Sequence, residues 1–147
     1  MVYLDSSACI KRYVLEEGSE EARRAYLRAY SGEVILSMSL WNVGEVLGAL
    51  DRALRRGRLD AAAHSTARSR FLSETLRLWR LGAMSLVPVK LSLLAESWRV
   101  LERRHLYVAD ALQISTAKHA RAELLLTGDS RLAEAAEAEG VPSRVIG

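Results

Sequence analysis

Cysteine is nearly absent from this chain of 147 residues, since Cys9 is the only one. A single cysteine excludes an intramolecular disulfide and a thiolate metal cluster, and we interpret Cys9 as a small apolar core residue. Long hydrophobic runs are also missing: none approaches the ~20 residues that a membrane crossing needs. Met1–Leu4 run directly into Asp5 and leave no room for a signal peptide, so we expect a cytoplasmic protein with no membrane partner.

Side-chain amides and lysines are scarce as well. Asn42 and Gln113 are the only amides, and the 21 basic residues include only three lysines. Because amides are thermolabile, their scarcity suggests a thermophilic source. Arginine binds phosphate through a planar fork, so an arginine-rich chain with a net charge of +3 favours a nucleic-acid partner. Solvated helix faces and a GC-rich genome would produce the same composition.

Short strand signals alternate with helical patterns along the whole chain. This alternation predicts an α/β fold in which helices cover both faces of a parallel sheet, and the length fits one domain. The intervals 38–83 and 90–122 each have room for two helices, although the sequence assigns no role to the long helical stretch 60–81. The expected strands are 2–4, 33–37, 85–89, 124–127 and 144–146.

Four acidic residues without a basic helical neighbour lie at or near the ends of predicted strands: Asp5, Glu45, Asp110 and Asp129. Asp5 and Asp129 each follow a strand directly, where a functional carboxylate and a simple helix N-cap are equally plausible. Glu45 lies inside a helix and has no basic partner three or four residues away. A solvated helix face is the alternative for Glu45.

Asp110 is the most informative of the four acids because its helical neighbours are mostly apolar. Burying a lone carboxylate costs several kcal/mol, so Asp110 must be hydrogen-bonded, protonated or bound to a cation. A first-turn acid favoured by the helix dipole is the alternative.

Acids at the ends of parallel strands can converge, because these ends open into one crevice. Close carboxylates repel one another and raise their pKa values. Mg²⁺ or Mn²⁺ would relieve this repulsion, since both ions prefer oxygen ligands. Such ions can activate water for attack on a phosphodiester.

Other catalytic arrangements lack their signatures. The chain has no Walker loop, no Gly-x-Gly-x-x-Gly and no nucleophile elbow, and its three histidines do not have zinc-site spacing. Phospho-receiver domains also gather acids at strand ends, but the adjacent acids and the final lysine that they use are missing.

Four segments resemble the motifs of PIN-domain proteins, especially the VapC-like toxins of type II toxin–antitoxin pairs. Residues 3–13 resemble the family's opening, 39–46 its glutamate-bearing motif, 107–117 its third motif and 126–132 its fourth. Their order matches the family over nearly the whole chain. The resemblance implies a PIN-like three-layer α/β/α fold with a central parallel sheet of about five strands, formed as a single domain by residues 1–147.

The resemblance also implies a metal-dependent endoribonuclease that cleaves structured RNA, such as tRNA or rRNA. Asp5, Asp110 and Asp129 would hold Mg²⁺ or Mn²⁺, and Glu45 would bind an ion directly or through water. Toxins of this family are typically homodimers blocked by a small antitoxin, so the resemblance implies both partners. Two further residues would support the site: Ser6 and Thr127.

RNA phosphates would enter a cleft with arginines at its rim. The arginines nearest to Glu45 in sequence are Arg52, Arg55, Arg56 and Arg58. Trp41 is a candidate for stacking on a base, with a partly buried packing role as the alternative.

Two other functions remain open from the sequence. A non-toxin PIN nuclease in RNA processing would share the chemistry, and the neighbouring gene would distinguish it from a toxin. A catalytically inactive RNA-binding module would keep its binding after Asp5→Asn or Asp110→Asn.

Overall fold

The computed structural model describes residues 1–147, which form five strands with seven helices between them. The strands are β1 (Val2–Leu4), β2 (Leu36–Ser39), β3 (Met84–Val87), β4 (Leu124–Thr127) and β5 (Ser143–Val145). The helices are α1 (Ser6–Ile10), α2 (Ser19–Tyr30), α3 (Leu40–Arg55), α4 (Ala61–Arg80), α5 (Leu91–Arg104), α6 (Val108–His119) and α7 (Ser130–Ala138).

The strands form one all-parallel sheet in the order β3-β2-β1-β4-β5. This confirms the predicted α/β fold with a central parallel sheet of five strands. β1 lies in the middle, where Val2 is in register with Leu36 of β2 and with Leu124 of β4. Pro142 directly precedes the edge strand β5, a position that a residue without a backbone N–H tolerates.

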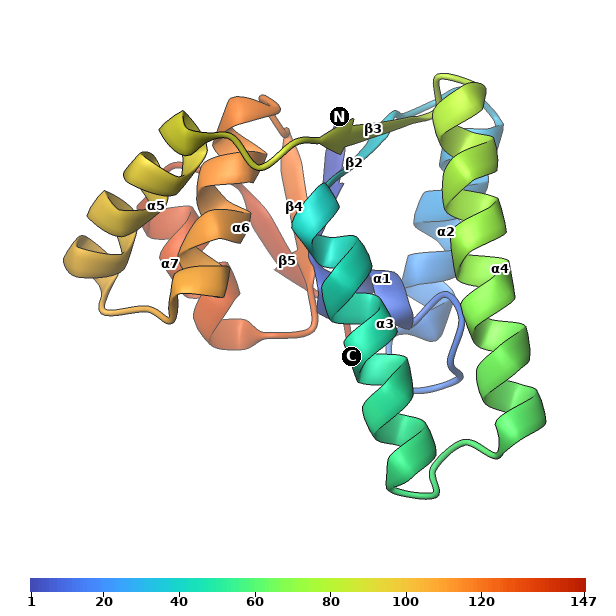
Figure 1. Ribbon diagram of the computed structural model, residues 1–147. Helices are drawn as coiled ribbons and strands as arrows, with labels where there is room; N and C mark the ends of the chain where they lie inside the picture. Colours follow the sequence, from blue (N-terminus) through green and yellow to red (C-terminus); the bar gives the residue numbers. More distant parts are fainter.

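The helices divide between the two faces of the sheet, with α1 to α4 on one side and α5 to α7 on the other (Figure 1). Side chains alternate along β1, so Val2 and Leu4 enter the first core while Tyr3 enters the second. Cys9 is fully buried in the first core, as expected from the sequence. The two cores therefore meet at β1, the strand that leads into Asp5.

The long helix α4 belongs to the first layer and runs beside α3 (Figure 1). The carboxylate of Asp60 caps it by accepting a hydrogen bond of 2.7 Å from the backbone N–H of Ala63. Phe71 and Leu78 bury their side chains in the first core. The stretch 60–81 thus contributes a helix to the packing of the first core. None of the helices combines the length and apolar character that a membrane crossing requires.

Candidate active site

The ends of the central strands bring the first and last motifs together. Leu4 is in register with Leu126, and the backbone N–H of Asp5 donates to the carbonyl of Leu126 at 3.2 Å. Asp5 is the residue after β1, and Thr127 is the last residue of β4. Parallel pairing therefore places these two side chains next to each other, although 122 positions separate them in the sequence.

Asp5 is almost completely buried and is held by several hydrogen bonds. Its carboxylate accepts from Thr127 Oγ1 at 2.8 Å and from the backbone N–H of Ala8 at 2.8 Å. Ser7 Oγ lies 2.8 Å from both carboxylate oxygens. Burial raises the pKa of Asp5 to about 6, and the charge of Glu45 adds to this rise while the donors oppose it. Asp5 is thus fixed in place before any ligand binds.

Ser7, the neighbour of the predicted Ser6, is the serine that supports Asp5. Its hydroxyl also accepts a hydrogen bond of 2.7 Å from the backbone N–H of Gly128, which ties α1 to the loop after β4. Ser6 instead lines a cavity beside Glu45. Thr127, the other predicted supporting residue, donates its hydroxyl hydrogen bond to Asp5.

Asp129 is exposed and caps α7. Its Oδ1 accepts hydrogen bonds from the backbone N–H groups of Arg131 at 2.8 Å and Leu132 at 3.3 Å. Its own N–H donates to Thr127 Oγ1 at 3.0 Å, so Thr127 bridges Asp5 and Asp129. Capping occupies only one carboxylate oxygen, and Oδ2 has no hydrogen-bond partner. The capping and ligand interpretations of Asp129 are therefore compatible.

Asp110 lies half-buried in the first turn of α6, and no protein group donates a hydrogen bond to its carboxylate. Burial raises its pKa, and the charges of Asp129 and Glu45 raise it further, against a smaller opposing effect of Arg131. These influences show that Asp110, Asp129 and Glu45 share one electrostatic neighbourhood. Asp110 is the acid in this group that most lacks a positive partner.

A buried network of amides positions Glu45. Gln113 Nε2 donates to Glu45 Oε2 at 3.0 Å and to Asn42 Oδ1 at 2.7 Å. Gln113 Oε1 accepts from the Tyr3 hydroxyl at 2.7 Å, and Asn42 Nδ2 donates to the carbonyl of Leu4 at 2.9 Å. Sequence reasoning missed Asn42 and Gln113, although their status as the only two amides of the chain was the signal that could have found them.

The donors of this site fit a hard divalent cation, but they do not form a ready-made ligand cage. No group of three acidic, histidine or cysteine side chains stands close enough to hold one ion. The chemistry available is carboxylate oxygen, which suits Mg²⁺ and Mn²⁺. The unpartnered carboxylate of Asp110 and the free Oδ2 of Asp129 are the atoms that a cation would satisfy.

The predicted rim residues take different positions. Arg52 on α3 and Arg56 directly after it are exposed and have no carboxylate partner, whereas Arg55 forms an ion pair of 2.9 Å with Asp51. Trp41 is half-exposed in the first turn of α3, one turn before Glu45.

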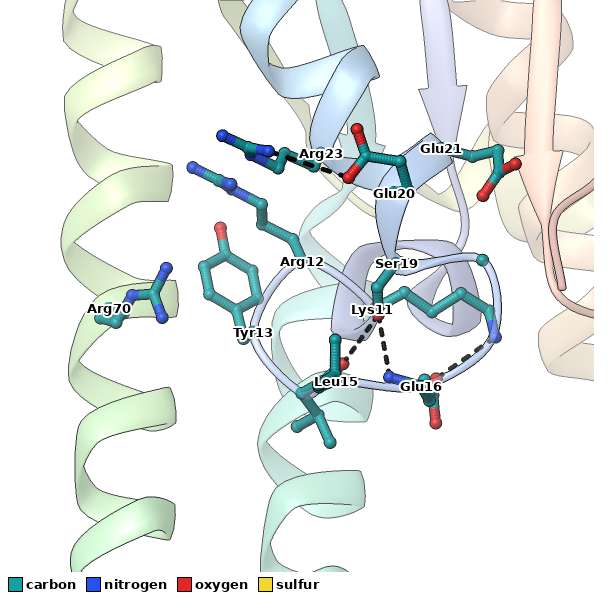
Figure 2. Close-up of a pocket in the computed structure, with 12 residues that line it drawn as sticks. Lys11, Arg12, Tyr13, Leu15, Glu16, Ser19, Glu20, Glu21, Arg23 and Arg70 are labelled. Carbon is teal, nitrogen blue, oxygen red and sulfur yellow. Dashed lines mark hydrogen bonds and ion pairs between the residues drawn. The ribbon is translucent and has the colours of Figure 1, made fainter.

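A separate cavity of about 620 Å³ lies between α4 and the loop that follows α1 (Figure 2). Arg12, Arg23 and Arg70 line it, together with Tyr13. The charge of Arg12 is balanced by Glu74 at 2.9 Å. None of the four acids at the strand ends lines this cavity.

The all-parallel α/β sheet thus carries Asp5 and Asp129 just beyond the carboxyl ends of β1 and β4, with Glu45 on α3 and Asp110 on α6. The chain belongs to the PIN domain family, whose family model matches residues 2–138. PIN domains are typically metal-dependent nucleases. No curated protein matches the sequence significantly.

Solved structures of low sequence identity share the fold. PAE2754 from Pyrobaculum aerophilum is 22% identical, with a TM-score of 0.67 over 97% of this chain and 82% of its own. VapC20 from Mycobacterium tuberculosis, described as a sarcin-ricin loop cleaving toxin, is 16% identical, with a TM-score of 0.67 over the whole of both chains. FitAB bound to an IR36 DNA fragment is 17% identical, with a TM-score of 0.66 over 99% of this chain and 94% of the matched chain.

Proposed function

We propose that this protein is a metal-dependent endoribonuclease, the toxin of a type II toxin–antitoxin pair that cleaves structured RNA such as tRNA or rRNA. The observation that carries the proposal is the carboxylate of Asp110. It is half-buried, receives no hydrogen bond and forms no ion pair, and the charges of Asp129 and Glu45 raise its pKa more than Arg131 lowers it. A buried acid in this state is stabilised by an external cation.

In the proposed mechanism, Asp5, Asp110 and Asp129 would hold Mg²⁺ or Mn²⁺, and Glu45 would bind the ion directly or through water. A bound divalent cation supplies the positive charge that favours ionised water and neutralises the phosphate. Thr127 and Ser7 keep Asp5 oriented, and Gln113 keeps Glu45 oriented.

Water then attacks phosphorus, and the bond from phosphorus to the 3′ oxygen breaks. The products carry a 5′-phosphate and a 3′-hydroxyl, and the proton lost by water balances the one gained by the leaving oxygen.

The biological assignment follows from the likeness to VapC20 and to FitAB. We propose that the protein acts in the cytoplasm as a homodimer that a small cognate antitoxin blocks. A gene for a small DNA-binding protein directly upstream would support the toxin. Its absence would favour a PIN nuclease that serves RNA processing.

The decisive experiment incubates the purified protein with a mixed RNA pool in Mg²⁺, in Mn²⁺ and in chelator. Asp110→Asn is compared with Asp51→Asn, which makes the same chemical change on an exposed acid paired to Arg55. We expect cleavage that requires metal, survives Asp51→Asn and disappears in Asp110→Asn. Sequencing of the product ends then identifies the substrate.

Two outcomes would contradict this proposal. Products with a 2′,3′-cyclic phosphate would exclude attack by water. RNA that binds but is not cut under any condition would identify an RNA-binding module without catalysis.

A further inference from the structure

A groove leads away from Glu45 between α1 and α3, which lie side by side in Figure 1. It begins as a cavity of about 370 Å³ lined by Ser6, Ser7 and Glu45, and continues as a second cavity of about 240 Å³ toward the end of α3. Three residues line both cavities, so the two form one continuous path: Ile10, Ala49 and Arg52.

The groove becomes positively charged with distance from Glu45. Arg52 lies at the junction of the two cavities, and Arg56 and Arg58 line the second. None of these three arginines forms an ion pair with the protein. Glu16 is the acid in the second cavity, and Lys11 balances it at 3.3 Å. The arginines are therefore free to bind an anionic ligand.

The floor of the groove is narrow and made of small residues. Gly44, Gly48 and Ala49 line its first part, so the α3 backbone is accessible there. A Cβ added at Gly48 would lie 3.5 Å from Arg52 Nη1, which shows that the Arg52 side chain folds back over α3 toward Glu45. Cavities of about 370 and 240 Å³ can take part of a flexible single strand, whereas a rigid duplex is too bulky to enter them.

No aromatic side chain lines either cavity. Proteins that grip the bases of single strands use aromatic stacking, whereas arginines bind the phosphates without regard to sequence. We propose that this groove holds the phosphate backbone of a single-stranded RNA segment next to the cleavage point, with Arg52, Arg56 and Arg58 as its phosphate ligands. This inference rests on the proposed function, because it names the strand that the carboxylates would cut.

The test measures binding of a fluorescent single-stranded RNA to the wild-type protein in chelator over a series of salt concentrations. Each phosphate contact on a single strand contributes a slope of about −0.7 in log K against log salt. We expect the triple variant Arg52→Gln, Arg56→Gln, Arg58→Gln to lose about 2 units of this slope.

The matched control is Arg68→Gln, Arg80→Gln, Arg121→Gln, which removes the same charge from exposed arginines that do not line the groove. We expect it to keep the wild-type slope. Arg55→Gln should change the slope less than Arg56→Gln, since Asp51 already holds Arg55. A duplex of the same sequence should lose less than the single strand.

A second variant, Gly48→Leu, blocks the groove without changing its charge. The side chain meets no backbone at this position, so the fold should persist, and we expect at least tenfold weaker binding of the single strand. Equal slopes for the two triple variants, or an equal loss on single strand and duplex, would overturn the proposal and leave the groove to an acidic protein segment.

Because binding is measured without cleavage, this test separates the groove from the nuclease. If the triple variant has a reduced salt slope and the wild-type protein never cuts RNA, the proposal for the groove is supported and the proposed nuclease is contradicted. An unchanged slope in a protein that cuts RNA would contradict the groove alone.

Discussion

Glu139 and Asp110 show how differently one chain can treat two carboxylates. Glu139 is nearly buried and accepts hydrogen bonds from Arg103 at 2.9 Å and Arg104 at 2.8 Å, with Lys118 at 3.5 Å. These partners, with Arg103 the strongest, lower the pKa of Glu139 to about 2. Asp110 is half-buried without any such partner, and its pKa is raised.

The difference separates an acid whose charge is balanced within the fold from an acid whose charge is not. Glu139, the residue directly after α7, forms ion pairs with basic residues at the ends of α5 and α6, so its charge is balanced within the fold. The charge of Asp110 is left for something outside the fold to balance. Arginines pair with Glu139 but none forms an ion pair with Asp110, so the absence of a partner distinguishes Asp110.

The largest expected effect is on cleavage. Asp110→Asn should lower the cleavage rate at least about 10³-fold, because losing a ligand to the catalytic ion removes several kcal/mol of transition-state stabilisation. Glu139→Gln should leave the rate unchanged at a temperature where it is folded. Single-turnover cleavage measures both variants, and equal losses would remove the functional distinction between the two acids.

A smaller effect is expected from Thr127→Val, which keeps the shape of the side chain but removes the donor to Asp5. Groups that hydrogen-bond to metal ligands typically contribute 10–100-fold, and we expect a loss of that size in cleavage rate. Titration with Mn²⁺ should show weaker metal binding in parallel. Wild-type metal affinity in this variant would show that Asp5 needs no orientation.

For the free energy of unfolding, we expect the larger loss in Glu139→Gln and not in Asp110→Asn, the reverse of their order for cleavage. Glu139→Gln should lower the free energy of unfolding by about 1–2 kcal/mol, since its arginine partners are partly exposed. Asp110→Asn should leave stability unchanged or raise it, because it removes a charge that its neighbours repel. Urea unfolding monitored by circular dichroism gives both values, and a destabilised Asp110→Asn would contradict the comparison.

Addition of metal should raise the stability of the wild-type protein. At ten times the dissociation constant, Mg²⁺ or Mn²⁺ should add about 1.4 kcal/mol through binding to the folded state alone. Thermal unfolding with and without the ion measures this shift. The shift should vanish in Asp110→Asn and persist in Glu139→Gln, and a shift retained in both variants would place the ion elsewhere.

The smallest expected effect is the change in stability at low pH. The folded-state pKa of Glu139 is about 2, below its ordinary value of 4.5, so its stabilisation is fully present above pH 4.5 and disappears as the pH falls toward 2. The stability difference between wild type and Glu139→Gln should therefore shrink over this range. Unfolding curves at several pH values measure it, and a constant difference would mean that the charge of Glu139 is unimportant.

The sequence predicted the sheet well because its strands are short apolar runs between helices, and β1 and β4 lie at the predicted residues 2–4 and 124–127. The start of β2 was predicted three residues too early. Glu33 and Val34 donate their backbone N–H groups to the carbonyl of Arg28, so they complete the turn after α2 and do not pair in the sheet.

The acids of the candidate site could be proposed from the sequence because each lacked a basic neighbour, but the groups that contact them could not. Ser6 and Ser7 are adjacent, and only the cap geometry at Asp5 decides that Ser7 points back to the carboxylate. Asn42 and Gln113 lie 71 positions apart, so only the packing of α6 against the end of β2 reveals that they form one network.

The pairing of β1 with β4 also has a consequence for synthesis of the protein. Asp5 is synthesised before its partner Thr127, which comes 122 residues later in the chain. A nascent chain therefore lacks a complete site until β4 has left the ribosome and paired with β1, and such long-range pairing is slow. The proposed nuclease activity would therefore begin only after this pairing, when the messenger and the ribosome that produce the chain have already done their work.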